Sequence, residues 1–206
     1  LVDCAGMRLE EATDALEAFG KLYECQALAS GVVPQITAVF GTCGGGMAVV
    51  PDLTDFTFME AKNAKLFVNS PNALEGNKTE NTANAAFQSS EAGMVDVVAQ
   101  EDELLESIRT LVSILPANNE DDMSYEECTD DLNRASETLE NAVGDPAVIC
   151  SEIGDDHVFV ETKAAYAKEM ATGFIRLNGM TVGAVANGEQ EMTARGAQKA
   201  AEFVEF

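Results

Sequence analysis

Three consecutive glycines, Gly44–Gly46, stand between two apolar runs in the stretch VFGTCGGGMAVV, residues 39–50. Because glycine has no Cβ, it adopts backbone conformations closed to other residues and lets the bare backbone approach another group closely. Such a run between a strand and a helix is either a tight, closely packed turn or a place where backbone N–H groups meet a ligand. The stretch alone favours neither interpretation.

The segments around the glycines alternate between strand and helix patterns. Residues 9–30 carry apolar side chains at spacings of three and four, with acidic residues opposite, and predict an amphipathic helix. Its inner face is expected to hold Leu9, Ala12, Leu16, Phe19, Tyr23 and Ala27. The other expected elements are strands at 1–3, 35–40, 55–60 and 65–70, a helix start at 47–50, and a helix at 101–115. This alternation is typical of an α/β fold with parallel strands.

The second half of the chain departs from that alternation. Residues 116–145 hold many acidic and few large apolar residues and predict a linker between domains, with a short helix near 128–142. Asn178-Gly179 predicts the two-residue turn of a β-hairpin whose strands cover 174–177 and 180–185. A last helix is expected at 193–206, with Thr193 as its N-cap.

Composition excludes several classes of function. A formal net charge of −24 argues against binding to nucleic acid or to anionic membrane surfaces. We identify no apolar run long enough to span a bilayer and no signal peptide. Five widely spaced cysteines and a single histidine, His157, argue against a disulfide framework or a metal site and favour free thiols in the cytoplasm. The chain starts inside an apolar run without Met, so we expect it to be a partial chain.

A second small-residue turn, Ala5-Gly6, leads from a strand into a helix in the stretch DCAGMRLEEA, residues 3–12. Two such turns within one α/β unit would bring two sets of backbone N–H groups to the same edge of a sheet. Two donors from different segments that converge on one oxygen are what an oxyanion hole requires. Neither turn matches a P-loop or a GxGxxG dinucleotide motif.

Several other residues are assigned structural roles. Asp52 and Asp55 are expected to serve in capping and turns, and His157 is expected at the surface. Cys4 and Cys43 lie in the two glycine turns, so they are expected to come close in space as small buried hydrophobic residues. Arg8 is expected to form a surface or interdomain salt bridge.

Four blocks in sequence order resemble the carboxyltransferase component of biotin-dependent acyl-CoA carboxylases and decarboxylases. Family patterns similar to DSGGARxxEG, ASGxxPQI, GPCAGGA and PALTDFxFM appear here as 3–8 (DCAGMR), 29–36 (ASGVVPQI), 41–46 (GTCGGG) and 51–59 (PDLTDFTFM). The likeness covers nearly the whole chain. Met7 stands where the family has Ala, and Gly44 also replaces an Ala of the family pattern.

The resemblance implies a crotonase-like (ClpP/crotonase) ββα superhelix in a two-domain carboxyltransferase. It implies that residues 1–115 belong to the acyl-CoA domain, 116–155 to an acidic interdomain linker, and 156–206 to the start of the second domain. The implied reaction moves a carboxyl group between biotin and a short-chain acyl-CoA through an enolate. Gly45 and Gly46 match the oxyanion-hole backbone, and Gly6, Met7 and Gly44 are expected on the acyl-CoA side.

The same resemblance implies the partners. Biotin would be attached covalently to a carrier protein, and other carboxylase or decarboxylase subunits would associate with the chain. The chain itself would form a homo-oligomer built from dimers, which we expect to be a hexamer. We expect a cytoplasmic location, including the periphery of a membrane decarboxylase complex, and no bound metal. Two alternatives stay open: another crotonase-fold CoA-ester enzyme, such as a hydratase or hydrolase, or a shortened, non-catalytic assembly subunit.

Overall fold

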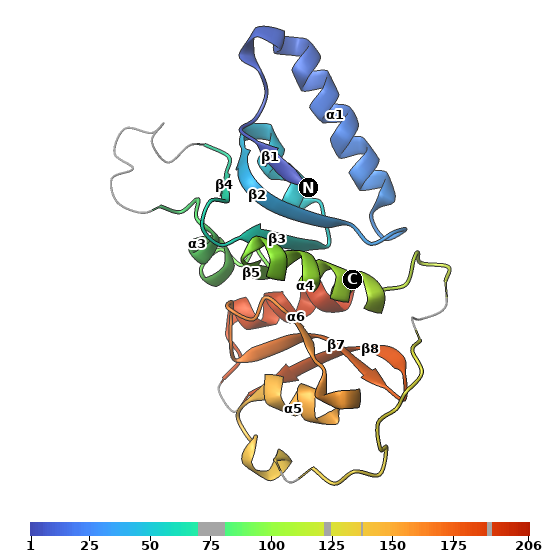
Figure 1. Cartoon of the computed structure of the whole chain (residues 1–206). Coiled ribbons are helices and arrows are strands. Elements are labelled where there is room, and N and C mark those ends of the chain that lie inside the picture. Colours follow the sequence, from blue (N-terminus) through green and yellow to red (C-terminus); the bar gives the residue numbers. More distant parts are fainter. Residues whose placement is uncertain (70–80, 122–124, 137, 189–190) are drawn as a thin grey trace. The chain divides into compact units, whose positions relative to one another are not determined.

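The computed structural model describes residues 1–69, 81–121, 125–136, 138–188 and 191–206. Parts of two expected features, the strand at 65–70 and the linker at 116–155, lie outside the described residues. The chain divides into two units, residues 1–108 with 117–119, and residues 109–116 with 120–206 (Figure 1). Each unit is described by itself.

The first unit is built on a parallel sheet. Its strands are β1 (Val2–Cys4), β2 (Ile36–Gly44), β3 (Phe56–Glu60), β4 (Lys65–Phe67) and β5 (Val97–Ala99). The order is β1-β2-β3-β5, and β4 also pairs with β2. The first half of β2 is in register with β3, from Ile36 to Val39, and its last three residues, 42–44, are in register with β4. All these pairs are parallel, which confirms the expected α/β class.

Helices connect the strands, as parallel pairing requires. They are η1 (Leu9–Glu11), α1 (Ala12–Ala29), η2 (Gly45–Ala48), α2 (Val49–Asp52), α3 (Ala85–Ser90) and α4 (Glu101–Ile114). The helices expected at 9–30 and 101–115 are confirmed, whereas α3 and β5 were not predicted. Helix α4 is shared between the units, which divide after Ile108. None of the described helices is long and apolar enough to cross a membrane.

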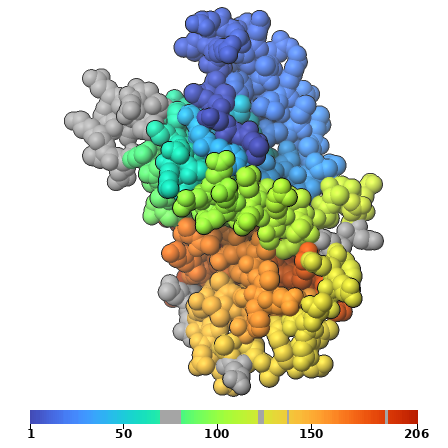
Figure 2. All heavy atoms as spheres, in the orientation of Figure 1, coloured from blue at the N-terminus to red at the C-terminus, as the bar shows by residue number. Residues whose placement is uncertain are grey.

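The expected inner face of α1 was only partly right. Ala15 is buried and Phe19 and Tyr23 are half-buried, whereas Leu9 and Leu16 are 81% and 58% exposed. Residues at spacings of four form one narrow stripe along a helix, and Leu16 lies about 100° around the helix from Ala15. The atoms of α1, in blue, accordingly lie at the surface of the first unit (Figure 2).

The core of the first unit surrounds β2. Val39 and Cys43 on this strand are fully buried and pack in one cluster with residues of the neighbouring strands. The other buried members are Ala48, Met59, Ala64, Leu66, Ala85 and Val95. Because β2 has sheet neighbours on both sides and a buried cluster around it, its carboxyl end is held firmly at the glycine turn.

The second unit contains an antiparallel sheet of β6 (Val160–Thr162), β7 (Met170–Leu177) and β8 (Met180–Asn187). Its helices are η3 (Leu139–Asn141), α5 (Pro146–Ile153), η4 (Asp155–His157) and α6 (Ala194–Glu205). The hairpin and the last helix are confirmed. The Thr193 side chain caps α6, where it accepts a hydrogen bond from the N–H of Gly196 at 3.0 Å.

The helix expected near 128–142 was wrong. The described residues of that segment hold only η3, and the α-helix starts later, at Pro146. Asp145 caps α5 by accepting a hydrogen bond from the N–H of Val148 at 3.2 Å, and Pro146 fits the first helical position because it needs no hydrogen-bond acceptor there. The segment from residue 120 on belongs to the second unit; its role as an interdomain linker stays a prediction.

The hairpin turn needs glycine at its second position. Asn178 and Gly179 have φ of 52° and 79°, as a type I′ turn requires. A Cβ on Gly179 would lie 1.9 Å from the carbonyl oxygen of Glu126, which leaves no room for a side chain. Tyr125, the residue before Glu126, also forms a β-bridge to Met180.

We therefore expect Gly179→Ala to destabilise the hairpin by more than about 1 kcal/mol, because it adds both a clash and an unfavourable φ. The measurement is hydrogen–deuterium exchange of β7 and β8, which should become faster. Asn178→Gly is the matched control, since glycine tolerates the same φ, and its exchange should stay near that of the wild type. Equal exchange in Gly179→Ala and the wild type would contradict this account of the turn.

Candidate functional site

The two glycine turns lie side by side. β1 and β2 are parallel neighbours with Cys4 opposite Cys43, so the turns that follow them leave the same edge of the sheet. A Cβ on Gly6 would lie 3.0 Å from the carbonyl oxygen of Gly44 and 3.7 Å from the Cα of Gly45. The structure therefore brings Gly6, Gly44 and Gly45 together, as the sequence indicated.

Each of these three positions requires glycine, two because of backbone conformation and one because of space. Gly6 and Gly45 have φ of +118° and +60°, which L side chains rarely adopt. At Gly44 the limit is space, because a Cβ would lie 2.8 Å from both the carbonyl oxygen of Ala5 and the ring of Phe67. The structure therefore shows tight packing between the two turns. Binding of a ligand by their backbone N–H groups is a separate property, which has to be tested.

Gly46 is supported from helix α1. The Tyr23 hydroxyl donates a hydrogen bond to the carbonyl oxygen of Gly46, and the ring of Phe19 stacks on that of Tyr23 with centroids 5.9 Å apart. Burial raises the pKa of Tyr23, which keeps the hydroxyl protonated as a donor. This contact fixes the peptide unit after Gly46. Sequence reasoning assigned Tyr23 only a core role, and its i, i+4 spacing from Phe19 was the one available signal.

The turn also places N–H groups at the start of a helix. The 3₁₀-helix η2 begins at Gly45, directly after the last residue of β2. The first N–H groups of a helix have no carbonyl partner within that helix, and they point outward from its N-terminal end. Gly45 and Gly46 contribute the first two of these groups.

The side chain of Asp3 joins β1 to β2 just before the first turn. Its Oδ1 accepts a hydrogen bond from the N–H of Thr42 at 2.8 Å. A Cβ on Gly41 would lie 2.1 Å from that oxygen, so the glycine makes room for the carboxylate. Sequence reasoning assigned Asp3 no such role, since nothing in its spacing indicates which backbone group it would meet.

Met7 and Arg8 follow the first turn at the surface. Met7 is 37% exposed, and Arg8 forms an exposed ion pair with Glu11 at 3.5 Å. The expected surface salt bridge of Arg8 is therefore confirmed. Met7 adjoins Gly6 in the chain, and its expected place on the acyl-CoA side stays a prediction.

Asp55 and His157 have the structural roles that the sequence predicted, whereas Cys4, expected to be buried, is partly exposed because it lies on β1 at the end of the sheet order. Asp52 is the last residue of α2, and its capping role stays a prediction. Asp55 accepts a hydrogen bond from the N–H of Gln35 at 2.7 Å, which holds the chain at the start of β2. His157 is half-exposed, with its Nδ1 3.5 Å from the carboxylate of Glu152. Cys43 is fully buried, and burial followed by the nearby Cys4 raises its pKa to about 11, so it is held as a neutral thiol. Within the described ranges, no group of three or more His, Cys, Asp and Glu side chains is arranged to hold a metal ion.

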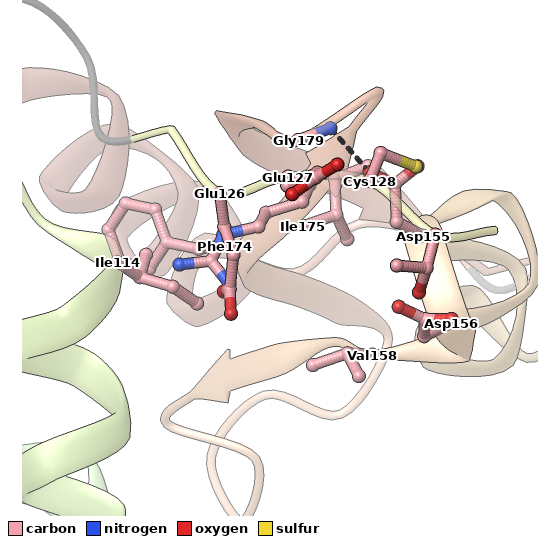
Figure 3. Close-up of a pocket in the computed structure, with 12 residues that line it drawn as sticks. Ile114, Glu126, Glu127, Cys128, Asp155, Asp156, Val158, Phe174, Ile175 and Gly179 are labelled. Atoms are coloured by element: carbon pink, nitrogen blue, oxygen red, sulfur yellow. Dashed lines mark hydrogen bonds and ion pairs between the residues drawn. The ribbon is translucent and has the colours of Figure 1, made fainter.

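The second unit contains a cavity of about 340 Å³ (Figure 3). Its lining includes residues 126–129, the hairpin residues 174–176 with Gly179, and Asp155.

The Asp155 carboxylate accepts hydrogen bonds from the N–H groups of Asn178 at 3.0 Å and Gly179 at 2.7 Å. Burial acts to raise the pKa of Asp155, but these bonds and one from the Cys128 thiol outweigh it and hold the pKa below its ordinary value. Asp155 thus clamps the hairpin turn, a role that the sequence did not reveal.

We expect Asp155→Asn to destabilise the second unit by about 1–3 kcal/mol at pH 7, because the amide cannot accept both backbone N–H groups. A folded-state pKa below the unfolded one gives stability that is present above pH 4 and is lost as the pH falls through the folded pKa. The gap in melting temperature between wild type and variant should therefore shrink below pH 4.

Asp156→Asn is the matched control, since the neighbouring Asp156 is exposed and Asn tolerates its φ of 51°. Its melting temperature should follow that of the wild type at every pH. A gap between wild type and Asp155→Asn that does not depend on pH would contradict the clamp.

Comparison with solved structures places the fold in a class. The chain superimposes on a crystal structure of transcarboxylase 12S that has hydrolysed methylmalonyl-coenzyme A bound. The TM-score is 0.90 and the sequence identity is 31%, and the match covers 100% of this chain and 43% of the transcarboxylase chain. A second transcarboxylase 12S structure, with methylmalonyl-coenzyme A and methylmalonic acid bound, gives a TM-score of 0.89. The fold is thus that of a crotonase-like carboxyltransferase, as expected.

The family follows from the sequence. The family model of the carboxyl transferase domain matches residues 1–206, and the chain belongs to that family. A propionyl-CoA carboxylase beta chain of Roseobacter denitrificans is 33% identical over 99% of this chain and 43% of its own length. The alpha subunit of methylmalonyl-CoA decarboxylase of Propionigenium modestum is 34% identical over 93% of this chain and 40% of its own length. The chain therefore spans less than half the length of these relatives.

Proposed function

We propose that the full-length protein transfers a carboxyl group between biotin, carried on a partner protein, and a short-chain acyl-CoA. Support comes from membership of the carboxyl transferase family and from relatives that are named for propionyl-CoA and methylmalonyl-CoA. The observation that carries the proposal is the convergence of the two glycine turns, which places Gly6 beside Gly44 and Gly45 at one edge of the sheet of the first unit.

In this proposal Gly45 and Gly46 stabilise the enolate of the acyl-CoA. Loss of the α-proton puts nearly a full negative charge on the thioester oxygen. Two backbone N–H groups aimed at this oxygen are fixed before the reaction, so they lower the barrier without having to reorganise. The hydrogen bond from Tyr23 and the φ of Gly45 support that fixed orientation. Gly6, Met7 and Gly44 would form the adjacent acyl-CoA side.

The step balances without an additional co-reactant. When bound, biotin supplies the carboxyl group on its ureido nitrogen. The α-carbon of the enolate would form a bond to this carboxyl carbon as the bond from that carbon to nitrogen breaks, and the proton lost from the α-carbon would be the one that the nitrogen takes up. Decarboxylation of the acyl-CoA is the reverse. The chain's part is to stabilise the oxygen charge, which fits a site formed by backbone groups rather than by an acid or a base.

The proposed partners follow from the same reasoning. A biotin carrier protein and further subunits of a carboxylase or decarboxylase would deliver and accept the carboxyl group. We propose a homo-oligomer assembled from dimers into a hexamer, in the cytoplasm or at the periphery of a membrane complex. The solved transcarboxylase 12S, to which the chain is similar over its whole length, is described as a hexamer that binds substrate in a multienzyme core.

Gly45→Val in the full-length protein tests the proposed oxyanion role. Valine cannot adopt the φ of +60°, so the N–H groups of residues 45 and 46 should turn away from the substrate. Loss of one such donor lowers kcat by about 10²–10³-fold. The assay is carboxyl transfer between acyl-CoA and free biotin, and we expect a loss of that size with melting temperature and acyl-CoA affinity recorded alongside.

Gly20→Val is the matched control, because Gly20 lies in α1 and a Cβ there would meet no atom within 4 Å beyond the backbone of the helix itself. Its activity should stay near that of the wild type. If Gly45→Val folds and keeps full activity, the assignment of Gly45 is wrong. If the wild type itself transfers no carboxyl group to or from biotin, the proposed reaction is wrong.

A further inference from the structure

Two cysteines face each other at the base of the glycine turns. Cys4 ends β1 and Cys43 lies one residue before the end of β2, and the two are directly opposite in the parallel register. The register shifts between the two pairs Val2–Val39 and Cys4–Cys43, and Cys4 and Cys43 are paired where β1 ends. Paired strands lie about 4.8 Å apart. A disulfide joins Cα atoms about 4.4–6.8 Å apart, so the sheet already holds this pair within reach.

Each thiol is bound to a carbonyl oxygen of its own turn. The Cys4 thiol donates to the carbonyl oxygen of Gly6 at 3.5 Å, and the Cys43 thiol donates to that of Met47 at 3.4 Å. Met47 lies in η2, the helix that starts at Gly45. The two S–H protons therefore take part in holding the two turns in place.

We propose that Cys4 and Cys43 form a reversible disulfide under mild oxidation, and that this bond switches off the adjacent glycine turns. The inference rests on the proposed function for its effect on activity but not for the chemistry of the thiols. Neither cysteine forms a disulfide in the structure.

Exposure determines the order of the steps. Cys4 is partly exposed, whereas Cys43 is fully buried, so a peroxide reaches Cys4 first. Its thiol and hydrogen peroxide give a sulfenic acid and one water. The Cys43 thiol then attacks the Cys4 sulfur, the S–O bond breaks, the disulfide forms, and a second water leaves. The raised pKa of Cys43 keeps its thiolate scarce at neutral pH, so this second step should become faster as the pH rises.

The disulfide would disturb the turns because it consumes both donors. The carbonyl oxygens of Gly6 and Met47 lose their S–H partners, and the sulfur atoms must turn toward each other. The backbone around these turns has little spare space, since even a Cβ on Gly6 would lie 3.0 Å from the carbonyl oxygen of Gly44, and one on Gly44 would lie 2.8 Å from that of Ala5. A shift of either turn therefore moves the N–H groups that follow it.

The first arm of the experiment detects the bond itself. The full-length protein is treated with hydrogen peroxide, remaining thiols are blocked with iodoacetamide, and the protein is digested with chymotrypsin. Cleavage after Phe40 separates Cys43 from Cys25. We expect a peptide pair that joins Cys4 to Cys43, with two hydrogen atoms fewer than the separate peptides. The pair should be absent in Cys4→Ser and present in Cys25→Ser, the control at an exposed cysteine.

The second arm measures carboxyl transfer. Oxidation should lower the activity by about tenfold or more, and dithiothreitol should restore it. Relative to its own untreated activity, Cys4→Ser should lose none on oxidation, whereas Cys25→Ser should respond as the wild type does. Failure to detect the Cys4–Cys43 peptide pair overturns the proposal, and a disulfide without loss of activity overturns the switch. An enzyme that is inactive even when reduced would count against the proposed function, while the peptide analysis would still decide on the disulfide.

Discussion

The parallel pairing of β1 with β2 is the constraint on which the candidate site depends. It sends both strands out at the same edge of the sheet, with Cys4 opposite Cys43, and so places Gly6 against Gly44 and Gly45. The carboxylate of Asp3 adds a hydrogen bond to β2, for which Gly41 leaves room. The burial of Val39 and Met59 then anchors β2 in the core. Each of these features fixes the position of the backbone, and the candidate site is composed of backbone groups.

Backbone donors also suit a chain of this composition. With 36 acidic and 12 basic residues, the chain offers few cations to a developing negative charge, and Arg8, the basic residue beside the first turn, is exposed and paired with Glu11. Peptide N–H groups carry partial positive charge wherever the fold directs them, whatever the net charge of the side chains. Glycine is the residue that lets such groups approach a ligand most closely, so the proposed function adds a second reason for the glycines that the backbone conformation and packing at this edge already require.

The sequence predicted features that are governed by local chemistry. The strand and helix alternation around the glycine turn, the Asn178-Gly179 hairpin and the Thr193 cap were all confirmed, because each depends on neighbours in the chain. Long-range contacts were not predictable: Tyr23 meets Gly46 across 23 residues, and Asp155 meets Gly179 across 24. The wrong helix near 128–142 and the partly exposed face of α1 have the same cause, since periodicity describes a helix but not what packs against it.

The central claim is that N–H groups at the glycine turns bind the thioester oxygen of an acyl-CoA. Its most direct test is the infrared spectrum of propionyl-CoA, labelled with carbon-13 at the thioester carbonyl, bound to the full-length protein. Hydrogen bonds from two fixed donors polarise the C=O bond, so we predict a band at lower frequency than in water, with the shift lost in Gly45→Val. A bound thioester whose carbonyl band stays at its solution frequency would contradict the claim.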